Sequence, residues 1–162
     1  MNNEQIEAAR ESYDNGYYAK KLEEGLLFQD VVTAELYQRG IVVIGYASRR
    51  YQREAGENML GAEIKRDGKF RETGNLYLEI AEKSHPDNAE YIPSGIERGD
   101  NSWLYVIGDE KTIYIFSNKY LRLLKGRYKQ VTTATSIGAL MPINEAEKYC
   151  LRRIDIGVTN GV

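Results

Sequence analysis

The chain has 162 residues, of which 42% are hydrophobic and 28% are charged, and its formal net charge is −2. This size and composition are those of one globular domain with its own core, and they exclude a disordered chain. The charge excludes a protein that coats nucleic acid through an excess of basic side chains, and no apolar run approaches the ~20 residues that a membrane-spanning helix needs.

Cysteine and histidine are almost absent from the chain: Cys150 and His85 are the only ones. A lone cysteine cannot form an internal disulfide, and we therefore expect a cytoplasmic protein. A zinc site built from histidine and cysteine within one chain is strongly disfavoured. Any metal is therefore expected to be held by carboxylates, which favours Mg²⁺, Mn²⁺ or Ca²⁺.

The first quarter of the chain predicts helix and then strand. Residues 1–16 are polar and predict a short helix or a loose arm. Apolar residues recur at helical spacing over 18–39, and Gly40 suits the position just after a helix end. The run 41–44 predicts a buried strand, and the polar segment 49–58 predicts a connection.

The segment 61–83 predicts two strands, 61–67 and 74–83, that pair as a hairpin turning around residues 70–72. Side chains alternate along a strand, so Glu63, Lys65 and Asp67 are expected on one face of the first strand. By the same rule Glu79 and Lys83 share one face of the second.

In this hairpin register Glu63 lies opposite Glu79. Two opposed carboxylates repel each other unless a cation or a proton lies between them. A divalent metal held by oxygen ligands, with a lysine nearby, would make the arrangement useful. The alternative is a solvated hairpin face with ordinary Lys–Glu pairs, which contributes little to stability.

The remaining segments predict a mixed α/β core within a single domain over residues 1–162. Residues 84–101 are rich in turn residues and predict an irregular loop. The next segments predict a second hairpin from strands 102–107 and 111–117, a helix over 119–124, a strand near 130–135 and a helix over 144–152.

Several spaced motifs, in order, resemble the PD-(D/E)xK nuclease superfamily, which has the restriction-endonuclease-like fold. They are Glu63-Ile-Lys-x-Asp67, Thr73-Gly-Asn-Leu-Tyr-Leu-Glu79, Pro93-Ser-Gly-Ile96 and Asp100-Asn-Ser-Trp103. More narrowly, they look like small phage and mobile-element proteins of that superfamily. The resemblance implies a core in which a helix precedes a β-meander that carries the acids, with flanking helices.

The resemblance also implies roles for individual residues. Glu63 or Asp67 would be the first acid, and Glu79 the acid of the (D/E)xK element. The position two after Glu79 is Ala81 rather than lysine, so the ammonium group would come from Lys65 or Lys83.

The resemblance also allows a second assignment of the (D/E)xK element and implies one further acidic residue. Glu63-Ile-Lys65 can itself be the (D/E)xK element, but then no Pro-Asp-like strand precedes it. Such nucleases often add a glutamate from a helix, for which Glu35 is the candidate and Gln29 a poorer one. Glycine permits close approach, so the Ser94-Gly95 loop could present backbone N–H groups to a phosphate.

The function that this resemblance implies is Mg²⁺- or Mn²⁺-dependent hydrolysis of DNA phosphodiester bonds, by a protein of a bacterial or phage-infected cytoplasm that acts as a homodimer. Metal ligands would be Glu63, Asp67, Glu79 and Glu35, with Lys65 or Lys83 beside them. Ala81 and the pI of about 5.6 favour an alternative, a catalytically inactive nuclease-fold module that binds nucleic acid or a protein. A third hypothesis is an accessory protein whose tyrosine-rich strands bind a partner.

Overall fold

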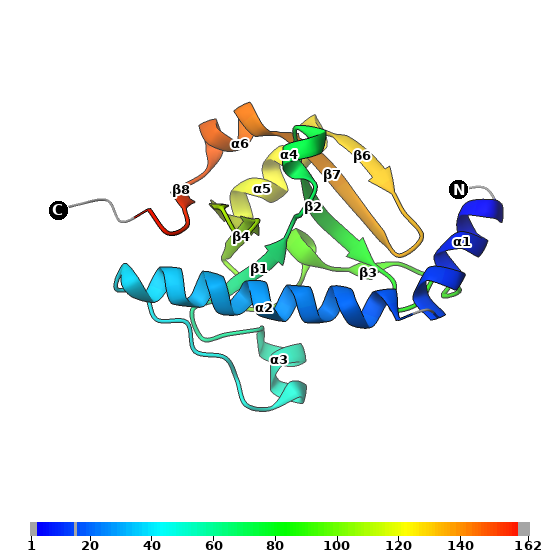
Figure 1. Ribbon diagram of the computed structural model, residues 1–162, viewed down its shortest axis with the longest axis horizontal. Coiled ribbons are helices and arrows are strands. Elements are labelled where there is room, and N and C mark those ends of the chain that lie inside the picture. Colours follow the sequence, from blue (N-terminus) through cyan, green and yellow to red (C-terminus); the bar gives the residue numbers. More distant parts are fainter. Residues whose placement is uncertain (1–2, 15, 159–162) are drawn as a thin grey trace.

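The computed structural model describes residues 3–14 and 16–158, which form two four-stranded sheets flanked by helices (Figure 1). The helices are α1 (Asn3–Asp14), α2 (Tyr17–Gln38), α3 (Arg49–Ala55), α4 (Phe70–Thr73), α5 (Asn118–Leu124) and α6 (Ile143–Tyr149), with short 3₁₀ turns η1 (Gly95–Glu97) and η2 (Lys125–Arg127). The strands are β1 (Ala62–Arg66), β2 (Asn75–Glu82), β3 (Ile92–Pro93), β4 (Leu104–Gly108), β5 (Thr112–Ser117), β6 (Lys129–Thr132), β7 (Ser136–Pro142) and β8 (Arg152–Asp155).

The first sheet has the strand order β1-β4-β5-β8. Strand β1 runs parallel to β4, and Glu63 is paired with Tyr105 in that register. Strands β4 and β5 are antiparallel and form the second hairpin expected from the sequence. Strand β8 adds to β5 in antiparallel orientation and closes one side of the sheet.

The second sheet has the strand order β3-β2-β7-β6, and all its pairs are antiparallel. The longest strand pairing in this sheet is that of β2 with β7, and a β-bulge between Glu79 and Ala81 interrupts it. Residues Leu76 and Leu78 of β2 are fully buried on one face, so Tyr77 and Glu79 project from the other.

The predicted first hairpin is wrong, and so is the β-meander expected with it. Strands β1 and β2 lie in different sheets: β1 pairs with β4, and β2 pairs with β7. The residues expected to turn form α4 instead, and its Phe70 is buried in the core with 3% exposure. Helix α4, anchored by the buried Phe70, separates the two strands. Each pairs with a strand that is distant in the sequence, β1 with β4 and β2 with β7.

Two predictions in the first third of the chain are also wrong. The apolar run 41–44 is irregular: Val42 and Ile44 are exposed, and Val43 is partly buried against the core under α2. The Met59 N–H donates to the Ile44 carbonyl at 2.8 Å, and an isolated bridge joins Gly45 to Asn58. The predicted connection 49–58 contains helix α3, whose first turn is capped by Ser48 through the Tyr51 N–H at 3.3 Å. β-Branched composition favours a strand only where a sheet edge is available to pair with it.

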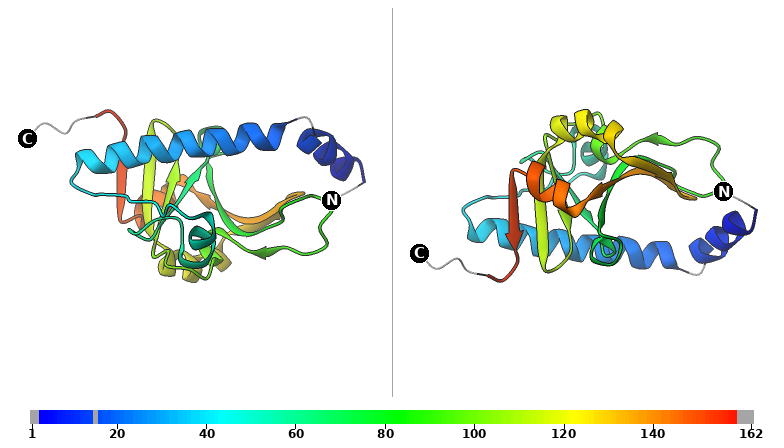
Figure 2. Two further views of the ribbon diagram at one scale, coloured as in Figure 1. Left: turned by 90° about the horizontal axis from the view of Figure 1, so that it is seen from below. Right: turned by 90° about the horizontal axis from the view of Figure 1, so that it is seen from above.

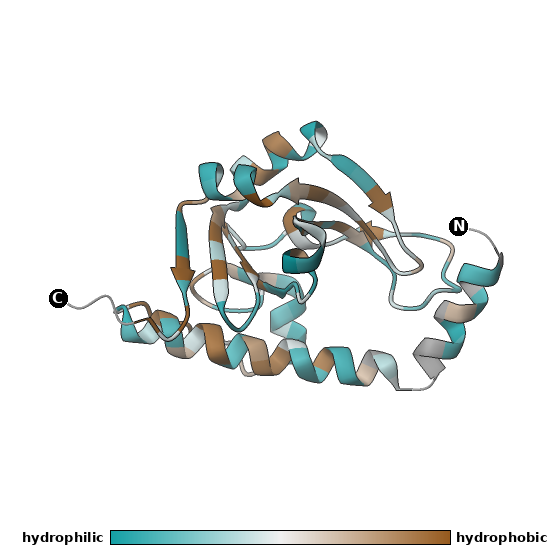
Figure 3. Cartoon of the chain, turned by 45° about the horizontal axis from the view of Figure 1, so that its top comes forward, coloured by the Kyte–Doolittle hydropathy of each residue, from teal (hydrophilic) through white to brown (hydrophobic). Residues whose placement is uncertain are grey.

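The predicted helix over 18–39 is confirmed as α2, and its apolar spacing explains the packing. Phe28, Val32 and Leu36 recur every four residues and are buried against one face of the first sheet, where Ile64 and Val106 lie. Figure 2 shows α2 running along this face, and Figure 3 shows hydrophobic residues gathered along the middle of α2 and on the strands.

The other face of the first sheet packs against the second sheet, α5 and α6. This second core contains the buried side chains of Leu76, Leu78, Tyr105, Phe116 and Met141. The helix predicted over 119–124 is confirmed as α5. The helix predicted over 144–152 is confirmed as α6 only as far as Tyr149, because Arg152 begins strand β8 instead. Both helices cover this core. The two cores therefore lie on opposite faces of the first sheet.

The N-terminal half of α2 extends beyond the first sheet and passes beside the second (Figure 1). Its Leu22 and Leu26 remain 55% and 53% exposed. Helix α1 continues from this end and reaches the β2–β3 connection, where Arg10 Nε lies 2.5 Å from Asp87 Oδ1. Within residues 3–14 and 16–158, no helix is both long and apolar enough to cross a bilayer.

Candidate functional site

Glu63, Lys65 and Glu79 meet where β1 and β2 approach each other from different sheets. Alternation along β1 sends Ile64 into the core under α2 and Glu63 and Lys65 to the opposite face. Lys65 Nζ lies 3.1 Å from Glu63 Oε1 and 3.1 Å from Glu79 Oε1. The ammonium group thus occupies the position between the two carboxylates.

Arg98 joins two further acids to this cluster. Its Nη1 lies 3.5 Å from Glu63 Oε2 and 3.6 Å from Glu57 Oε1, and its Nε lies 2.7 Å from Asp100 Oδ2. Sequence reasoning missed Glu57, Arg98 and Asp100. For Glu57 the available signal was its position six residues before Glu63, just before β1. Asp100 opens the Asp100-Asn-Ser-Trp103 motif, to which the sequence assigned no role, and Arg98 lies in a segment predicted to be an irregular loop.

The cluster has more acids than cations. Among the described residues it combines four carboxylates, from Glu57, Glu63, Glu79 and Asp100, with two cations, from Lys65 and Arg98. The side chain of Glu63 is only 1% exposed, so water cannot screen the excess. A buried site with surplus negative charge favours either protonation or a further cation.

Protonation of the cluster follows from its burial. Burial, together with the charge of Glu63, raises the pKa of Glu57 from 4.5 to about 7. Burial also raises the pKa of Glu63, against the attraction of Lys65 and Arg98. Burial opposes the charge on Lys65, but the carboxylates of Glu63 and Glu79 raise the pKa of this lysine well above its ordinary value. Lys65 is therefore charged at neutral pH, whereas Glu57 is partly protonated.

Several carboxylate oxygens of the cluster are buried without a hydrogen bond: Glu57 Oε2, both oxygens of Glu63, and Asp100 Oδ2. The contacts of Glu63 with Lys65 and Arg98 are ion pairs that lack hydrogen-bond geometry. Buried acceptors without donors are uncommon in folded proteins, and hard cations prefer such oxygens.

The carboxylates of this cluster are not arranged around a common metal position in the structure. In the part of the chain that the structure describes, no three acidic, cysteine or histidine side chains are grouped as a metal site. The ammonium group of Lys65 takes up the space between Glu63 and Glu79. Its side chain is 29% exposed and so has room to move outward.

The loop before η1 fixes the position of Glu79. Ser94, only 3% exposed, donates its hydroxyl to Glu79 Oε1 at 2.5 Å. Its backbone N–H donates to the Ile80 carbonyl at 3.0 Å. The sequence had led us to expect this N–H to be free to bind a phosphate. Instead it is hydrogen-bonded to β2. Arg122 of α5 holds the loop from outside by donating to the carbonyls of Ile96 and Arg98.

Replacing Gly95 with alanine is expected to destabilise the fold and to displace Glu79. Gly95 has φ +52°, and a Cβ there would lie 2.4 Å from the Glu79 carbonyl oxygen. The left-handed backbone alone costs about 1–2 kcal/mol, to which the overlap adds. Thermal unfolding of Gly95→Ala measures the loss. Gly99→Ala, in the same loop with open space around its Cβ, is the control. Equal melting temperatures for the two variants would contradict this account.

Asp67 is placed as a structural acid at the end of β1. Its Oδ2 accepts from the Tyr77 N–H at 2.8 Å and its Oδ1 from the Lys69 N–H at 3.0 Å. Both oxygens are thus used to fasten the turn to β2. Asp67 lines the groove described below, but no ion pair joins it to Lys65 in the structure as described.

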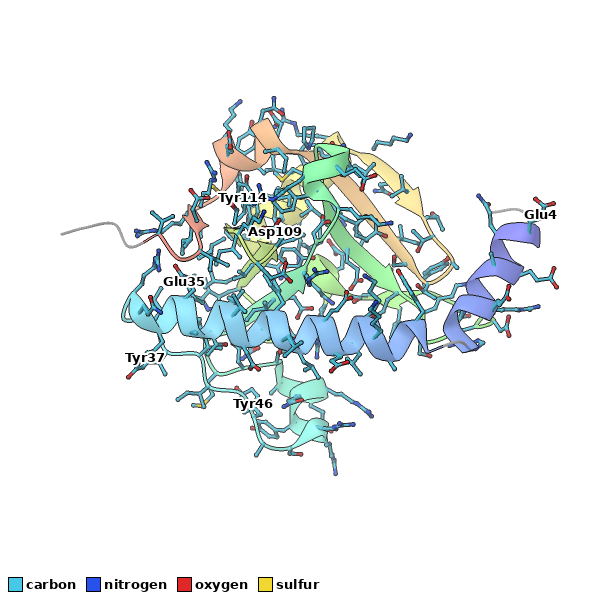
Figure 4. All side chains as sticks on the ribbon, in the orientation of Figure 1. Glu4, Glu35, Tyr37, Tyr46, Asp109 and Tyr114 are labelled. Carbon is cyan, nitrogen blue, oxygen red and sulfur yellow. The ribbon has the colours of Figure 1, made fainter. Side chains whose placement is uncertain are left out.

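Two other residues that the sequence singled out lie outside the cluster. Glu35 is buried and forms an ion pair with Arg39, near the C-terminal end of α2 (Figure 4). Lys83 Nζ lies 4.3 Å from the centre of the Tyr91 ring. Of the two lysines expected from the sequence, the structure brings Lys65 to the acids.

A groove of about 660 Å³ opens beside the cluster. Side chains of α2 between residues 17 and 29 form one wall, including Gln29, and the exposed face of β2 and β7 forms the other. Glu57, Lys65 and Glu79 line its floor. The groove connects the buried acids to solvent, which a site for an external substrate requires.

Comparison with known proteins found no match: no family model, curated protein or solved structure is similar to this chain beyond what chance would give. The function must therefore be argued from the site itself.

Proposed function

We propose that this protein is a Mg²⁺- or Mn²⁺-dependent nuclease that hydrolyses DNA phosphodiester bonds. The observation that carries the proposal is a lysine set between two glutamates, in a cluster with surplus carboxylates at the floor of an open groove. Acids for a divalent ion, an adjacent ammonium group and access for a polymer are what metal-assisted phosphodiester hydrolysis needs.

Glu57, Glu63 and Glu79 are the residues that would hold the metal. Their fit rests on the buried oxygens of Glu57 and Glu63 that lack hydrogen bonds and on the excess of acids over cations. When bound, a divalent ion at these oxygens would polarise the scissile phosphate and lower the pKa of a water molecule.

The remaining residues have positioning roles in this proposal. Lys65 moves outward toward the groove and offsets the negative charge that develops on the phosphate. Ser94 keeps Glu79 directed at the cluster through its hydroxyl. Arg98 holds Glu63 and Asp100 in place and is tied to α3 through the Gln52 carbonyl at 2.9 Å.

The arrangement favours one of the two registers that the sequence left open. With Glu63-Ile-Lys65 as the (D/E)xK element, Glu57 takes the place of the preceding acid. Glu57 comes from the turn before β1 rather than from a Pro-Asp strand, and Arg98 connects it with Glu63. In this register Ala81 need not be a lysine, and Glu79 is an additional acid from the second sheet.

Glu79→Gln is expected to lower Mg²⁺-dependent DNA cleavage by at least 10²-fold while the fold survives, because it removes one charged ligand and one partner of Lys65. The measurement is nicking of supercoiled and linear DNA in Mg²⁺ and in Mn²⁺. Glu35→Gln is the matched control, since Glu35 is a buried glutamate paired with Arg39 away from the groove, and it should cleave like wild type. Undiminished cleavage by Glu79→Gln would remove the proposal.

The second candidate function is an inactive nuclease-like module that binds nucleic acid or a protein. The position of the Lys65 ammonium group between Glu63 and Glu79 favours it, because a permanent salt bridge would block a metal. Titration calorimetry with Mn²⁺ discriminates the two. A single site that disappears in Glu63→Gln supports the nuclease; weak binding that is unchanged in Glu63→Gln supports the module.

A further inference from the structure

The groove next to the cluster contains one aromatic side chain in an unusual setting. Tyr77 lies two residues before Glu79 on β2, so both side chains project from the same face, about 6.6 Å apart along the strand. On the neighbouring strand β7, every second residue projects from that same face: Ser136, Gly138 and Leu140. Tyr77, Ser136 and Leu140 all line the groove.

The ring of Tyr77 lies flat on Gly138. A Cβ built on Gly138 would be 2.3 Å from Tyr77 Cζ and 2.6 and 2.7 Å from Cε2 and Cε1. The nearly equal distances to the two ε carbons, with Cζ closest, are those of a point directly above the ring plane. One face of the ring therefore covers the glycine, and only a residue without a side chain permits this contact.

The ring is also fixed at its far end. The Tyr77 hydroxyl lies 2.7 Å from Ser136 Oγ, and Ser136 Oγ in turn lies 2.9 Å from Thr133 Oγ1. A tyrosine held by its hydroxyl and by one face cannot turn freely, so its second face is presented to the groove at little entropic cost.

Lysines and a helix complete the surroundings of this ring. Lys69, after β1, lines the same groove and has no ion pair among the described residues. Lys21 of α2 also lines it, paired with Glu24 at 3.0 Å, and Lys65 lies between Glu63 and Glu79. Across the groove, Gly25 of α2 has open space where its Cβ would be. A flat aromatic face next to cations that can contact phosphates is the arrangement by which proteins bind unpaired nucleotides without regard to sequence.

We infer that Tyr77 is a stacking platform for one unpaired base, next to the phosphate at Glu79, and that the substrate is a single strand, a flap or a frayed end. The inference rests on the proposed nuclease function and names its substrate class. A groove of about 660 Å³ has the size of a ligand pocket and admits a segment of unpaired strand, whereas a duplex keeps its bases stacked inside. Because Tyr77 and Glu79 are neighbours on one strand face, a base on the ring places its own phosphate group at the floor.

The test measures binding without cleavage. The probe is a short single-stranded DNA with one 2-aminopurine, whose fluorescence falls when the base stacks, together with the matching duplex; both are titrated in EDTA. Wild type should quench the single-stranded probe and bind it at least tenfold more tightly than the duplex. Tyr77→Leu should weaken single-strand binding by about tenfold and abolish quenching. Tyr77→Phe, which keeps the ring but not the hydroxyl, should retain both.

Gly138→Ala provides an independent variant, because its Cβ must displace the Tyr77 ring while the identity of every groove side chain stays unchanged. It should lose quenching as Tyr77→Leu does; if it is unfolded by circular dichroism, the comparison of Tyr77→Phe with Tyr77→Leu decides. Equal affinity for single strand and duplex, or unchanged quenching in Tyr77→Leu, overturns the inference. Tyr77-dependent quenching supports it, even in a protein that fails to cleave DNA in Mg²⁺, a result that would overturn only the proposed nuclease function.

Discussion

Replacing Lys65 with methionine is expected to lower DNA cleavage by about 10²–10³-fold and, at the same time, to tighten Mn²⁺ binding by about tenfold or more. In the proposed nuclease the first effect follows because the ammonium group that would offset negative charge on the phosphate is lost. The second follows because this ammonium group lies 3.1 Å from both Glu63 and Glu79 and competes with a metal for them. Cleavage assays and Mn²⁺ titration calorimetry on the same preparation measure the two effects.

The opposite directions of these effects make the Lys65 experiment decisive. A lysine that merely stabilised the fold would lower both activity and metal binding when removed. Lys69→Met is the matched control: Lys69 lines the same groove, is exposed, and has no ion pair among the described residues. It should leave Mn²⁺ affinity unchanged. Weaker Mn²⁺ binding by Lys65→Met would contradict the proposed competition between lysine and metal.

The second large effect is a dependence of stability on pH that arises from Glu57. Burial raises the pKa of Glu57 from 4.5 to about 7, so the folded state binds more protons than the unfolded state between these values. The stability that Glu57 contributes is fully present below pH 4.5 and is lost as the pH rises through about 7. The loss amounts to at most about 3 kcal/mol.

Glu57→Gln is therefore expected to be more stable than wild type at pH 8 and similar to it at pH 4.5. Urea unfolding across this pH range measures the difference. Mg²⁺ should supply the same stabilisation to wild type at pH 8, because the proposed metal site exists only in the folded state and a cation there would offset the surplus negative charge. Glu54→Gln, an exposed glutamate of α3, is the control and should show neither effect. A Glu57→Gln variant that is less stable than wild type at pH 8 would refute the account of surplus charge.

The helical spacing of apolar residues over 18–39 correctly predicted α2, including the buried Val32 and Leu36. Two other residues of that spacing, Leu22 and Leu26, remain exposed, so the spacing alone did not define the buried face. Alternation along β1 and β2 correctly separates Glu63, Lys65 and Glu79 from the apolar side chains next to them. These patterns depend only on the geometry of helices and strands, so a single amino-acid sequence is enough to recognise them.

The predicted pairing of the strands 61–67 and 74–83 failed, whereas the second predicted hairpin, β4 with β5, was confirmed. A polar turn between two short strands favours a hairpin, but the burial of Phe70 and the non-local partners β4 and β7 outweighed it. The acids nevertheless meet, through the packing of two sheets rather than across a hairpin. For the same reason the sequence did not place Glu57, Arg98 and Asp100 beside Glu63: their proximity depends on where loops cross, which no local period records.

The sequence by itself determined which residue types carry charge on which strand face, and that histidine and cysteine are too few to form a metal site within one chain. Only the tertiary structure decided that Lys65 rather than Lys83 reaches the acids, that Asp67 fastens a turn, and that Glu35 pairs with Arg39. The reason is physical. Side-chain direction follows from local backbone geometry, whereas proximity follows from the burial of apolar surface between segments distant in the chain.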